Sequence, residues 1–219
     1  MSRAGRWDAL LLDLDGTLAD SIELILRSFR HTMQVHLGVV PPDSAWLAGL
    51  GTPLREQLRA FARDDEELEA MAATYVEYQR SVHDEMVRAY PGVTDMLEAV
   101  ASAGLRLAVV TGKRREMAAR TLRVCGLDRF FSVIITADDA VPGKPDAAPV
   151  RAAAAALGIA RTDRILLAGD SPHDIAAGRA AGVRTAAALW GARERDALLA
   201  AGPDYRVETV PALTALALG

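Results

Sequence analysis

The chain lacks the features that mark three broad classes of protein. It has a single cysteine, Cys125, which cannot form an internal disulfide, so we expect a reducing compartment with this thiol packed as a small core residue. Its net charge of −4 gives no basic footprint for a nucleic acid. No apolar run reaches the length of a membrane span, and the run that follows Arg3 and Arg6 breaks at Asp13, before the length of a secretory signal. We therefore expect a cytoplasmic protein with no nucleic-acid or membrane partner.

Lysine is also scarce, although basic residues are not. Among the 25 lysines and arginines, only Lys113 and Lys144 are lysines. A compact ammonium group approaches a carboxylate or a phosphate as a point charge, whereas the planar guanidinium of arginine needs more room. These two positions are therefore candidates for a site that holds anions.

The chain does have enough apolar material for a folded core. With 219 residues, of which 51% are hydrophobic and 25% charged, it fits one globular domain, or one domain that carries an insertion. Between residues 21 and 88 the apolar spacing is helical and no strand pattern appears. We expect four helices there: Ser21–Leu37, a short one through Leu47, a third through Phe61, and Asp64–Val87.

Beyond residue 90, short apolar strands alternate with helices. The expected strands are Leu105–Val110, Val133–Thr136, Ile165–Ala168 and, as the last one, Arg184–Ala188. The expected helices are Thr94–Ala103, Arg115–Cys125, Pro149–Leu157 and Ile175–Ala181. This alternation indicates right-handed crossovers and a parallel sheet. We therefore predict an α/β fold, with a doubly wound, Rossmann-like parallel sheet formed by residues 1–18 and 89–219 and a helical cap domain, residues 19–88, inserted after the first strand.

The stretch from residue 10 to residue 21 carries the clearest chemical signal. The apolar run Leu10–Leu12 is typical of a strand covered on both faces, and it ends at Asp13 and Asp15, which lie on the same side of an extended chain. Two such carboxylates repel each other by about 4 kcal/mol at a separation of ~4 Å and an effective dielectric of ~20. A divalent cation offsets this repulsion, and Mg²⁺ prefers one or two carboxylates together with phosphate oxygens. The pair therefore favours phosphoryl chemistry.

Further polar residues follow the other expected strands. In a doubly wound sheet, ligands bind beyond the carboxyl ends of the strands, where the strand order reverses. Each polar group by itself has an ordinary structural explanation as a helix-entry turn, a solvated loop charge or a helix cap. Their shared position at strand ends favours a common site formed by Asp13, Asp15, Thr111, Gly112, Lys144, Asp170 and Asp174.

Four segments, taken in order, resemble the motifs of the haloacid dehalogenase-like hydrolase superfamily. The helical insert between the first and second segments is similar to the small cap of the phosphoglycolate phosphatase-like branch, so the resemblance covers essentially the whole chain. The segments are Asp13-Leu14-Asp15-Gly16-Thr17, Thr111-Gly112-Lys113, Lys144-Pro145 and Gly169-Asp170-Ser171-Pro172-His173-Asp174.

The resemblance implies a role for each motif. Asp13 would attack phosphorus, and Asp15, protonated at the start, would donate a proton to the leaving oxygen and later accept one from water. Thr111, the Gly112 amide and Lys144 would hold the phosphoryl oxygens. Gly16, Thr17 and Lys113 would also contact substrate. Mg²⁺ would be bound by Asp13, the backbone carbonyl of Asp15 and Asp170, with Asp174 orienting these ligands.

Residues that are present or absent narrow the chemistry further. The second motif has Gly112 where many relatives have asparagine, and Ala147 stands where a second proline often follows, but neither change removes a required charge or hydroxyl. An acid at Asp15 suits a phosphate ester and disfavours carbon–halogen hydrolysis. No lysine precedes Lys113, which excludes a Schiff-base phosphonatase.

Substrate choice is assigned to the cap loop, residues 49–55. A glycine-flanked loop permits close approach, and an arginine suits a second anionic group, so Thr52 and Arg55 are predicted to touch the leaving group, with Arg27 as a weaker candidate. An alternative interpretation makes Arg55 a solvated helix residue. His31, His36 and His83 show no paired ligand spacing and are not expected to bind a metal.

Three functions stay open at this point. The first is a Mg²⁺-dependent phosphatase that acts on a small phosphorylated metabolite, such as a phosphoglycolate-like monoester, through an aspartyl-phosphate. The second is a pyrophosphatase or a sugar-phosphate mutase of the same superfamily. The third is a catalytically silent binding protein. The sequence allows either a monomer or a homodimer.

Overall fold

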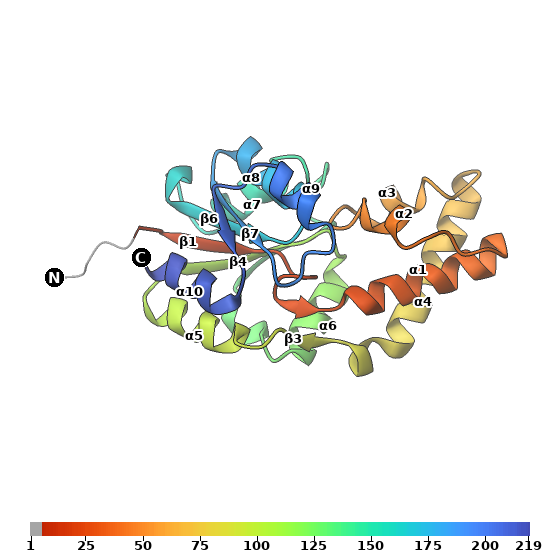
Figure 1. Cartoon of the computed structure of the whole chain (residues 1–219), viewed down its shortest axis with the longest axis horizontal. Helices are drawn as coiled ribbons and strands as arrows, with labels where there is room; N and C mark the ends of the chain where they lie inside the picture. The colour runs from red at the N-terminus through yellow and green to blue at the C-terminus, as the bar shows by residue number, and fades with distance from the viewer. Residues whose placement is uncertain (1–5) are drawn as a thin grey trace.

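The computed structural model describes residues 6–219, and its centre is a six-stranded parallel sheet with the order β5-β4-β1-β6-β7-β8 (Figure 1). The strand order reverses at β1, so the ends of β1, β4 and β6 meet at one edge. This arrangement confirms the predicted fold class. The strands are β1 (Ala9–Leu12), β4 (Arg106–Val110), β5 (Val133–Ile135), β6 (Ile165–Gly169), β7 (Arg184–Ala188) and β8 (Tyr205–Val207).

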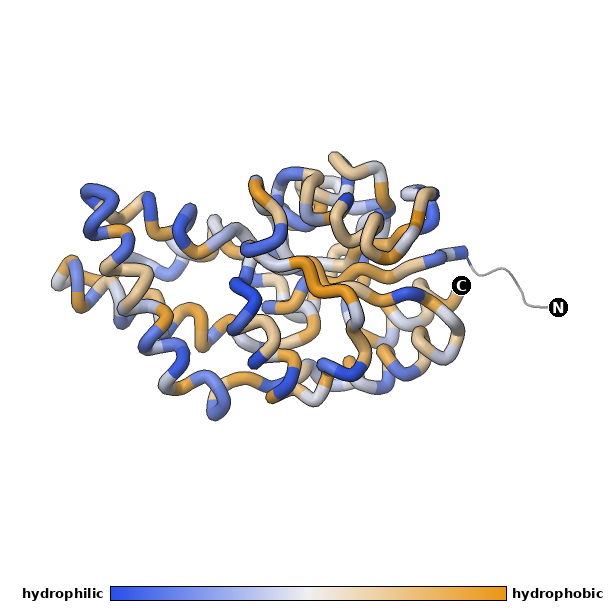
Figure 2. Tube along the Cα trace, turned by 180° about the vertical axis from the view of Figure 1, so that it is seen from behind, coloured by the Kyte–Doolittle hydropathy of each residue, from blue (hydrophilic) through white to orange (hydrophobic). Residues whose placement is uncertain are grey.

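The central strand β1 is buried on both faces because helices cover the two sides of the sheet. Leu10 and Leu12 pack into one apolar cluster with α5, α6 and α10, while Ala9 and Leu11 pack into another with α7 and α8. This is the two-residue alternation of a strand. Figure 2 shows the apolar strands running between more hydrophilic outer segments. The helices are α5 (Val93–Ser102), α6 (Arg115–Val124), α7 (Ala148–Ala156), α8 (Pro172–Ala181), α9 (Arg195–Ala200) and α10 (Val210–Leu218).

Four helices between β2 and β3 form a separate block, which lies beyond one end of the sheet (Figure 1). They share their own apolar cluster, in which Trp46 stacks on both Phe29 and Tyr75. The chain enters and leaves this block through a two-stranded antiparallel ribbon, β2 with β3. We propose that the cap domain, residues 19–88, begins and ends at this ribbon, as the sequence analysis predicts. The elements are β2 (Ala19–Asp20), α1 (Ile22–Leu37), α2 (Ser44–Leu47), α3 (Leu54–Leu58), α4 (Asp65–Met86) and β3 (Arg88–Ala89).

The end of the chain differs from the expectation. Arg184–Ala188 is not the last strand, because β8 pairs in parallel with β7 at the sheet edge, and α9 and α10 follow outside the predicted set. An edge strand of three residues with one buried side chain, Val207, leaves almost no periodic signal. Two short 3₁₀ turns, Asp128–Phe130 and Thr162–Arg164, precede β5 and β6. Among the described residues, no helix combines the length and the apolar character needed to cross a bilayer.

Candidate active site

The loop after β1 brings the first motif to the edge of the sheet. The Asp13 backbone N–H continues the sheet by donating to the Ala168 carbonyl, at 3.0 Å, and the Asp13 side chain is 3% exposed. Gly16 then turns the chain with φ +82, a conformation that side-chain-bearing residues rarely adopt. A Cβ at Gly16 would also overlap the carboxylate of Asp170. Glycine is therefore required here both by backbone conformation and by close packing.

Lys144 is the buried cation of the site. Its Nζ lies 2.9 Å from Asp13 Oδ1 and 2.6 Å from Asp174 Oδ1, and it donates to the Val110 carbonyl at 3.2 Å. Burial alone would lower the pKa of Lys144, but the charges of the two aspartates outweigh burial and raise this pKa. Asp174 Oδ2 accepts from both the backbone N–H and the hydroxyl of Ser171, which fixes the carboxylate at the start of α8. Lys144 therefore stays positively charged at neutral pH.

The remaining carboxylates of this cluster are crowded. Asp13, Asp170 and Asp174 each offer an oxygen, and these oxygens lie within 4.8 Å of one another. Burial raises the pKa of Asp13 to about 7, with Lys144 opposing the rise and Asp174 adding to it. Burial, and next the charge of Asp13, raise the pKa of Asp170 well above its ordinary value. One ammonium group faces three buried carboxylates, an excess of negative charge that favours a cation.

The carboxylate oxygens fit a hard divalent ion. Asp170 Oδ1 accepts from the Thr17 hydroxyl at 3.0 Å, but the buried Oδ2 has no hydrogen-bond partner in the described part of the chain. Asp13 Oδ1 likewise has none apart from its ion pair with Lys144. Oxygen ligands of this kind are what Mg²⁺ prefers. Both oxygens of Asp174 are already engaged, so Asp174 suits a positioning role better than direct ligation.

Asp15 has a different environment from Asp13. Its Oδ1 accepts from Lys113 Nζ and from the Ser21 hydroxyl, each at 2.5 Å. Burial by itself would raise the pKa of Asp15, but the Lys113 charge and these hydrogen bonds lower it below its ordinary value. The structure thus holds Asp15 as a carboxylate, which differs from the expectation of a protonated group. Sequence spacing placed both lysines near the motifs but did not indicate which aspartate each would contact.

The second motif is covered by the cap loop. Thr111 is 5% exposed, and its Oγ1 accepts from the Lys113 backbone N–H at 3.2 Å. A Cβ at Gly112 would lie 2.5 Å from the carbonyl oxygen of Gly51 in the cap loop. An asparagine at this position would therefore displace the loop as it stands here.

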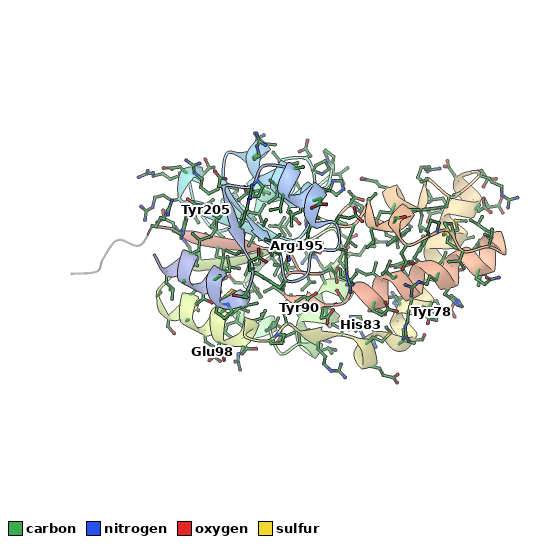
Figure 3. All side chains as sticks on the ribbon, viewed as in Figure 1. Tyr78, His83, Tyr90, Glu98, Arg195 and Tyr205 are labelled. Atoms are coloured by element: carbon green, nitrogen blue, oxygen red, sulfur yellow. The ribbon has the colours of Figure 1, made fainter. Side chains whose placement is uncertain are left out.

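A cavity of about 290 Å³ lies between the sheet edge and the cap. Its core wall contains Asp13, Asp15, Thr111, Gly112, Lys113, Asp170 and Ser171. Its cap wall is mostly apolar, with two amides and one cation, Arg80, and also contains Ile25, Trp46, Leu50, Gly51, Thr52, Leu54, Gln57, Tyr75, Val76 and Gln79. Figure 3 shows His83, on α4, near the junction between the cap and α6, where its Nε2 contacts Thr121 Oγ1 at 2.8 Å.

The predicted cap residues separate into two groups. Thr52 lines the cavity, although its hydroxyl donates to the Gly49 carbonyl at 2.7 Å. Arg55 does not line it, because its guanidinium forms two hydrogen bonds to Glu69 on α4, at 2.7 and 2.6 Å, beside a different hollow. The helix α3 begins at Leu54, and this orients Arg55 along the cap surface. The weaker candidate Arg27 is exposed and pairs with Glu23.

Two residues that contact site aspartates were given no site role from the sequence, although Ser171 was predicted as part of a helix cap. Ser21 hydrogen-bonds Asp15, and Ser171 anchors Asp174 as half of a capping box. Ser-Pro-His-Asp has the spacing of a capping box, so that second contact carried a readable signal. Ser21 carried none, because a serine before a helix ordinarily caps it, and here the Ser21 side chain makes no cap hydrogen bond.

Comparisons with known proteins point to one family. The family model of haloacid dehalogenase-like hydrolases matches residues 10–188. A pyrophosphatase PpaX from Halalkalibacterium halodurans is 36% identical over 206 residues, which span 94% of each chain. A putative pyrophosphatase PpaX from Clostridium perfringens is 34% identical over 200 residues, 91% of this chain and 92% of that one.

Solved structures resemble the whole chain as well. A putative phosphoglycolate phosphatase from Lactobacillus plantarum superposes with a TM-score of 0.84 at 26% identity, covering 96% of this chain and 99% of that one. A putative β-phosphoglucomutase from Thermotoga maritima gives a TM-score of 0.74 at 26% identity, covering 95% and 98%. The family match and the full-length relatives show that the chain belongs to the haloacid dehalogenase-like hydrolase family, as a hydrolase of the phosphatase type.

Proposed function

We propose that this protein hydrolyses small organic phosphomonoesters through a phosphorylated Asp13. The observation that carries the proposal is the buried group in which the Asp13 carboxylate lies 2.9 Å from Lys144 Nζ and shares a 4.8 Å cluster with Asp170 and Asp174. A nucleophile needs an accessible lone pair beside positive charge that can hold the incoming phosphate. Asp13 lines the cavity, and Lys144 supplies that charge.

In the first step an Asp13 oxygen attacks phosphorus, an acyl phosphate bond forms, and the bond from phosphorus to the leaving oxygen breaks. The leaving oxygen takes a proton from Asp15. In the second step Asp15 takes a proton from water as that water attacks phosphorus, and inorganic phosphate leaves while the Asp13 carboxylate is restored. Thr111 Oγ1, the Gly112 N–H and the Lys144 ammonium would hold the phosphoryl oxygens, so catalysis consists mostly of positioning and electrostatic stabilisation.

Asp15 must bind a proton before it can donate one. Its contact with Lys113, at 2.5 Å, stabilises the carboxylate form. A phosphate dianion that draws the Lys113 ammonium toward itself would weaken this contact, and the added negative charge would raise the pKa of Asp15. Lys113 would thus contact either Asp15 or substrate, which fits its predicted place among the substrate-binding residues.

Mg²⁺ would be held by Asp13, the Asp15 backbone carbonyl and Asp170, with Asp174 and Thr17 orienting these groups. When bound, the ion supplies positive charge that neutralises part of the carboxylate cluster and of the phosphate. The unpartnered Oδ2 of Asp170 supports this assignment.

A pyrophosphatase is the second candidate, favoured by the names of relatives that are 32–36% identical over more than nine-tenths of the chain. The same nucleophile and metal would serve that reaction, with phosphate as the leaving group. A mutase would isomerise a sugar phosphate without net release of phosphate.

The test is phosphate release from a panel of esters and pyrophosphate, with Mg²⁺ and with chelator, by the wild type and the Asp13→Asn variant. We expect release that requires Mg²⁺ and is lost in the variant. Mass spectrometry of the wild type quenched in acid should detect one added phosphoryl group, absent from Asp13→Asn. Undiminished release by the variant would disprove the nucleophile assignment.

A further inference from the structure

Two polar atoms on the cap side of the cavity have no hydrogen-bond partner in the described part of the chain. They are the indole Nε1 of Trp46 and the side-chain Oε1 of Gln57, and both atoms are shielded from solvent. Both residues line the cavity, and Trp46 is only 1% exposed. Folded proteins rarely leave such groups unsatisfied, so an unpartnered donor and an unpartnered acceptor on one wall indicate a ligand that satisfies both.

Local packing fixes the orientation of each group. The Gln57 Nε2 donates to the Thr52 carbonyl at 2.7 Å, which assigns the other end of the amide as the acceptor. Trp46 is held between aromatic rings, with ring centroids 4.7 Å from Phe29 and 5.6 Å from Tyr75. Turning the Trp46 ring would therefore require repacking of the cap core, and turning the Gln57 amide would break its hydrogen bond to Thr52.

The charges around the cavity disfavour an anionic leaving group. Three cations line it, and each already pairs with an acid: Lys113 with Asp15, Arg80 with Glu116, and Arg114 with Asp138. These three acids and two more, Asp13 and Asp170, also line the cavity. A carboxylate or second phosphate on the cap side would meet no unpaired cation among the described residues, and its oxygens would accept hydrogen bonds without satisfying Gln57 Oε1.

We propose that the substrate is the phosphomonoester of an uncharged, hydroxyl-bearing molecule, such as a polyol or sugar phosphate, and that Trp46 and Gln57 bind its hydroxyls. A hydroxyl accepts from the Trp46 N–H and donates to Gln57 Oε1, while the carbon skeleton packs on the apolar residues of the cap wall. The inference rests on the proposed phosphatase activity and names its substrate class. It disfavours both pyrophosphate and phosphoglycolate as the natural substrate.

The first test is a matched pair of substrates with the wild-type enzyme. Glycerol 3-phosphate and propyl phosphate share a three-carbon skeleton and differ only in hydroxyls. We expect kcat/KM for glycerol 3-phosphate to exceed that for propyl phosphate by about tenfold or more, since a site with buried polar groups rejects an analogue that lacks their partners. Phosphoglycolate and pyrophosphate, assayed in parallel, should fall below glycerol 3-phosphate.

The second test is the Trp46→Phe variant, which removes the N–H and keeps an aromatic ring in the cap core. It should lower the ratio of kcat/KM for glycerol 3-phosphate to that for propyl phosphate about fivefold, as should Gln57→Leu. The matched control is Trp7→Phe, because the Trp7 Nε1 donates to the Leu216 carbonyl at 2.9 Å, outside the cavity. Its ratio should equal that of the wild type. A ratio measured on one preparation does not depend on the fraction of folded protein.

The outcomes separate the two levels of the proposal. A preference for pyrophosphate, phosphoglycolate or propyl phosphate, or an unchanged ratio in both cap variants, would overturn the substrate class. If hydrolysis of whichever substrate is preferred is lost in Asp13→Asn, the proposed reaction through a phosphorylated Asp13 remains. Turnover that persists in Asp13→Asn would overturn the chemistry itself.

Discussion

The two walls of the cavity are built from opposite kinds of residue. On the core side, three buried carboxylates face one buried ammonium group, and backbone contacts at the end of β4 and the start of α8 fix Lys144 and Asp174. On the cap wall most side chains are apolar and two polar atoms have no partner, while the cations at its rim pair with acids in partly solvated positions. Under the proposed function, the difference means that the sheet encodes the reaction and that the cap encodes the choice of leaving group.

The seam between the two walls is closed by small residues. Gly112 lies against the carbonyls of Gly51 and Thr52, and a Cβ at Gly143 would lie 2.9 Å from the Pro53 ring. His173 Nε2 contacts the Ala48 carbonyl at 3.2 Å. Residues 48–53 thus contact the loops after β4 and β5 and the start of α8 directly.

The largest effect is expected at Lys144. Lys144→Met leaves Asp13 and Asp174 without their cation, and loss of one member of a buried ion cluster costs about 3–5 kcal/mol of unfolding free energy. Loss of the phosphate contact should lower kcat/KM by about 10³-fold or more. Urea unfolding in chelator and steady-state kinetics with Mg²⁺ measure the two effects. Arg114→Met is the control, because its ion pair with Asp138 is more exposed; equal stability of the two variants would contradict the buried-cluster interpretation.

The seam should show the next largest effect. Gly112→Asn introduces a Cβ 2.5 Å from the Gly51 carbonyl and pushes the cap loop away from the site. We expect kcat/KM to fall by about tenfold, since a displaced positioning element misaligns substrate. Gly126→Asn is the control, because a Cβ there meets nothing within 4 Å and asparagine tolerates its φ of +69. Unchanged kinetics in Gly112→Asn would show that the loop does not need this contact.

A smaller, pH-dependent effect is expected where the cap meets α6. Burial lowers the pKa of His83 below 6.5, with Asp84 opposing the shift and Lys113 and Arg120 adding to it. The folded state therefore binds this proton less tightly than the unfolded chain, so the stability contribution is complete above about pH 6.5 and is lost as the pH falls below it. Between pH 8 and pH 5, the unfolding free energy of the wild type should fall more than that of His83→Gln. Parallel pH curves would contradict the assignment.

The smallest effect is expected at Arg55, which distinguishes the cap surface from the cap wall. Its ion pair with Glu69 is about half exposed, so Arg55→Ala should change stability by no more than about 1 kcal/mol. Because the guanidinium lies outside the cavity, kcat/KM should stay within about twofold of the wild type for every ester. Glu69→Ala should behave in the same way. A fall in kcat/KM that is confined to phosphoglycolate would show instead that Arg55 contacts the leaving group.

The sequence predicted the site residues of the core wall better than those of the cap. Strand ends placed Asp13, Thr111 and Asp170 at one edge, because parallel strands in this topology have no other place to end. The expectation for Arg55 rested on loop composition, and a long side chain on a surface helix takes whichever acid lies within reach. The edge strand β8 was missed because three residues carry too little periodicity.

The sequence by itself determined the motifs, their order, the all-helical insert and the parallel sheet, since these depend on local spacing and on chain direction. Only the tertiary structure decided which lysine faces which aspartate, that Asp15 is held as a carboxylate, and that most of the cavity's cap wall is apolar. Those properties depend on side-chain reach and burial between segments separated by 30 to 98 residues, such as Lys144 with Asp174 and Lys113 with Asp15. No local pattern encodes such distances.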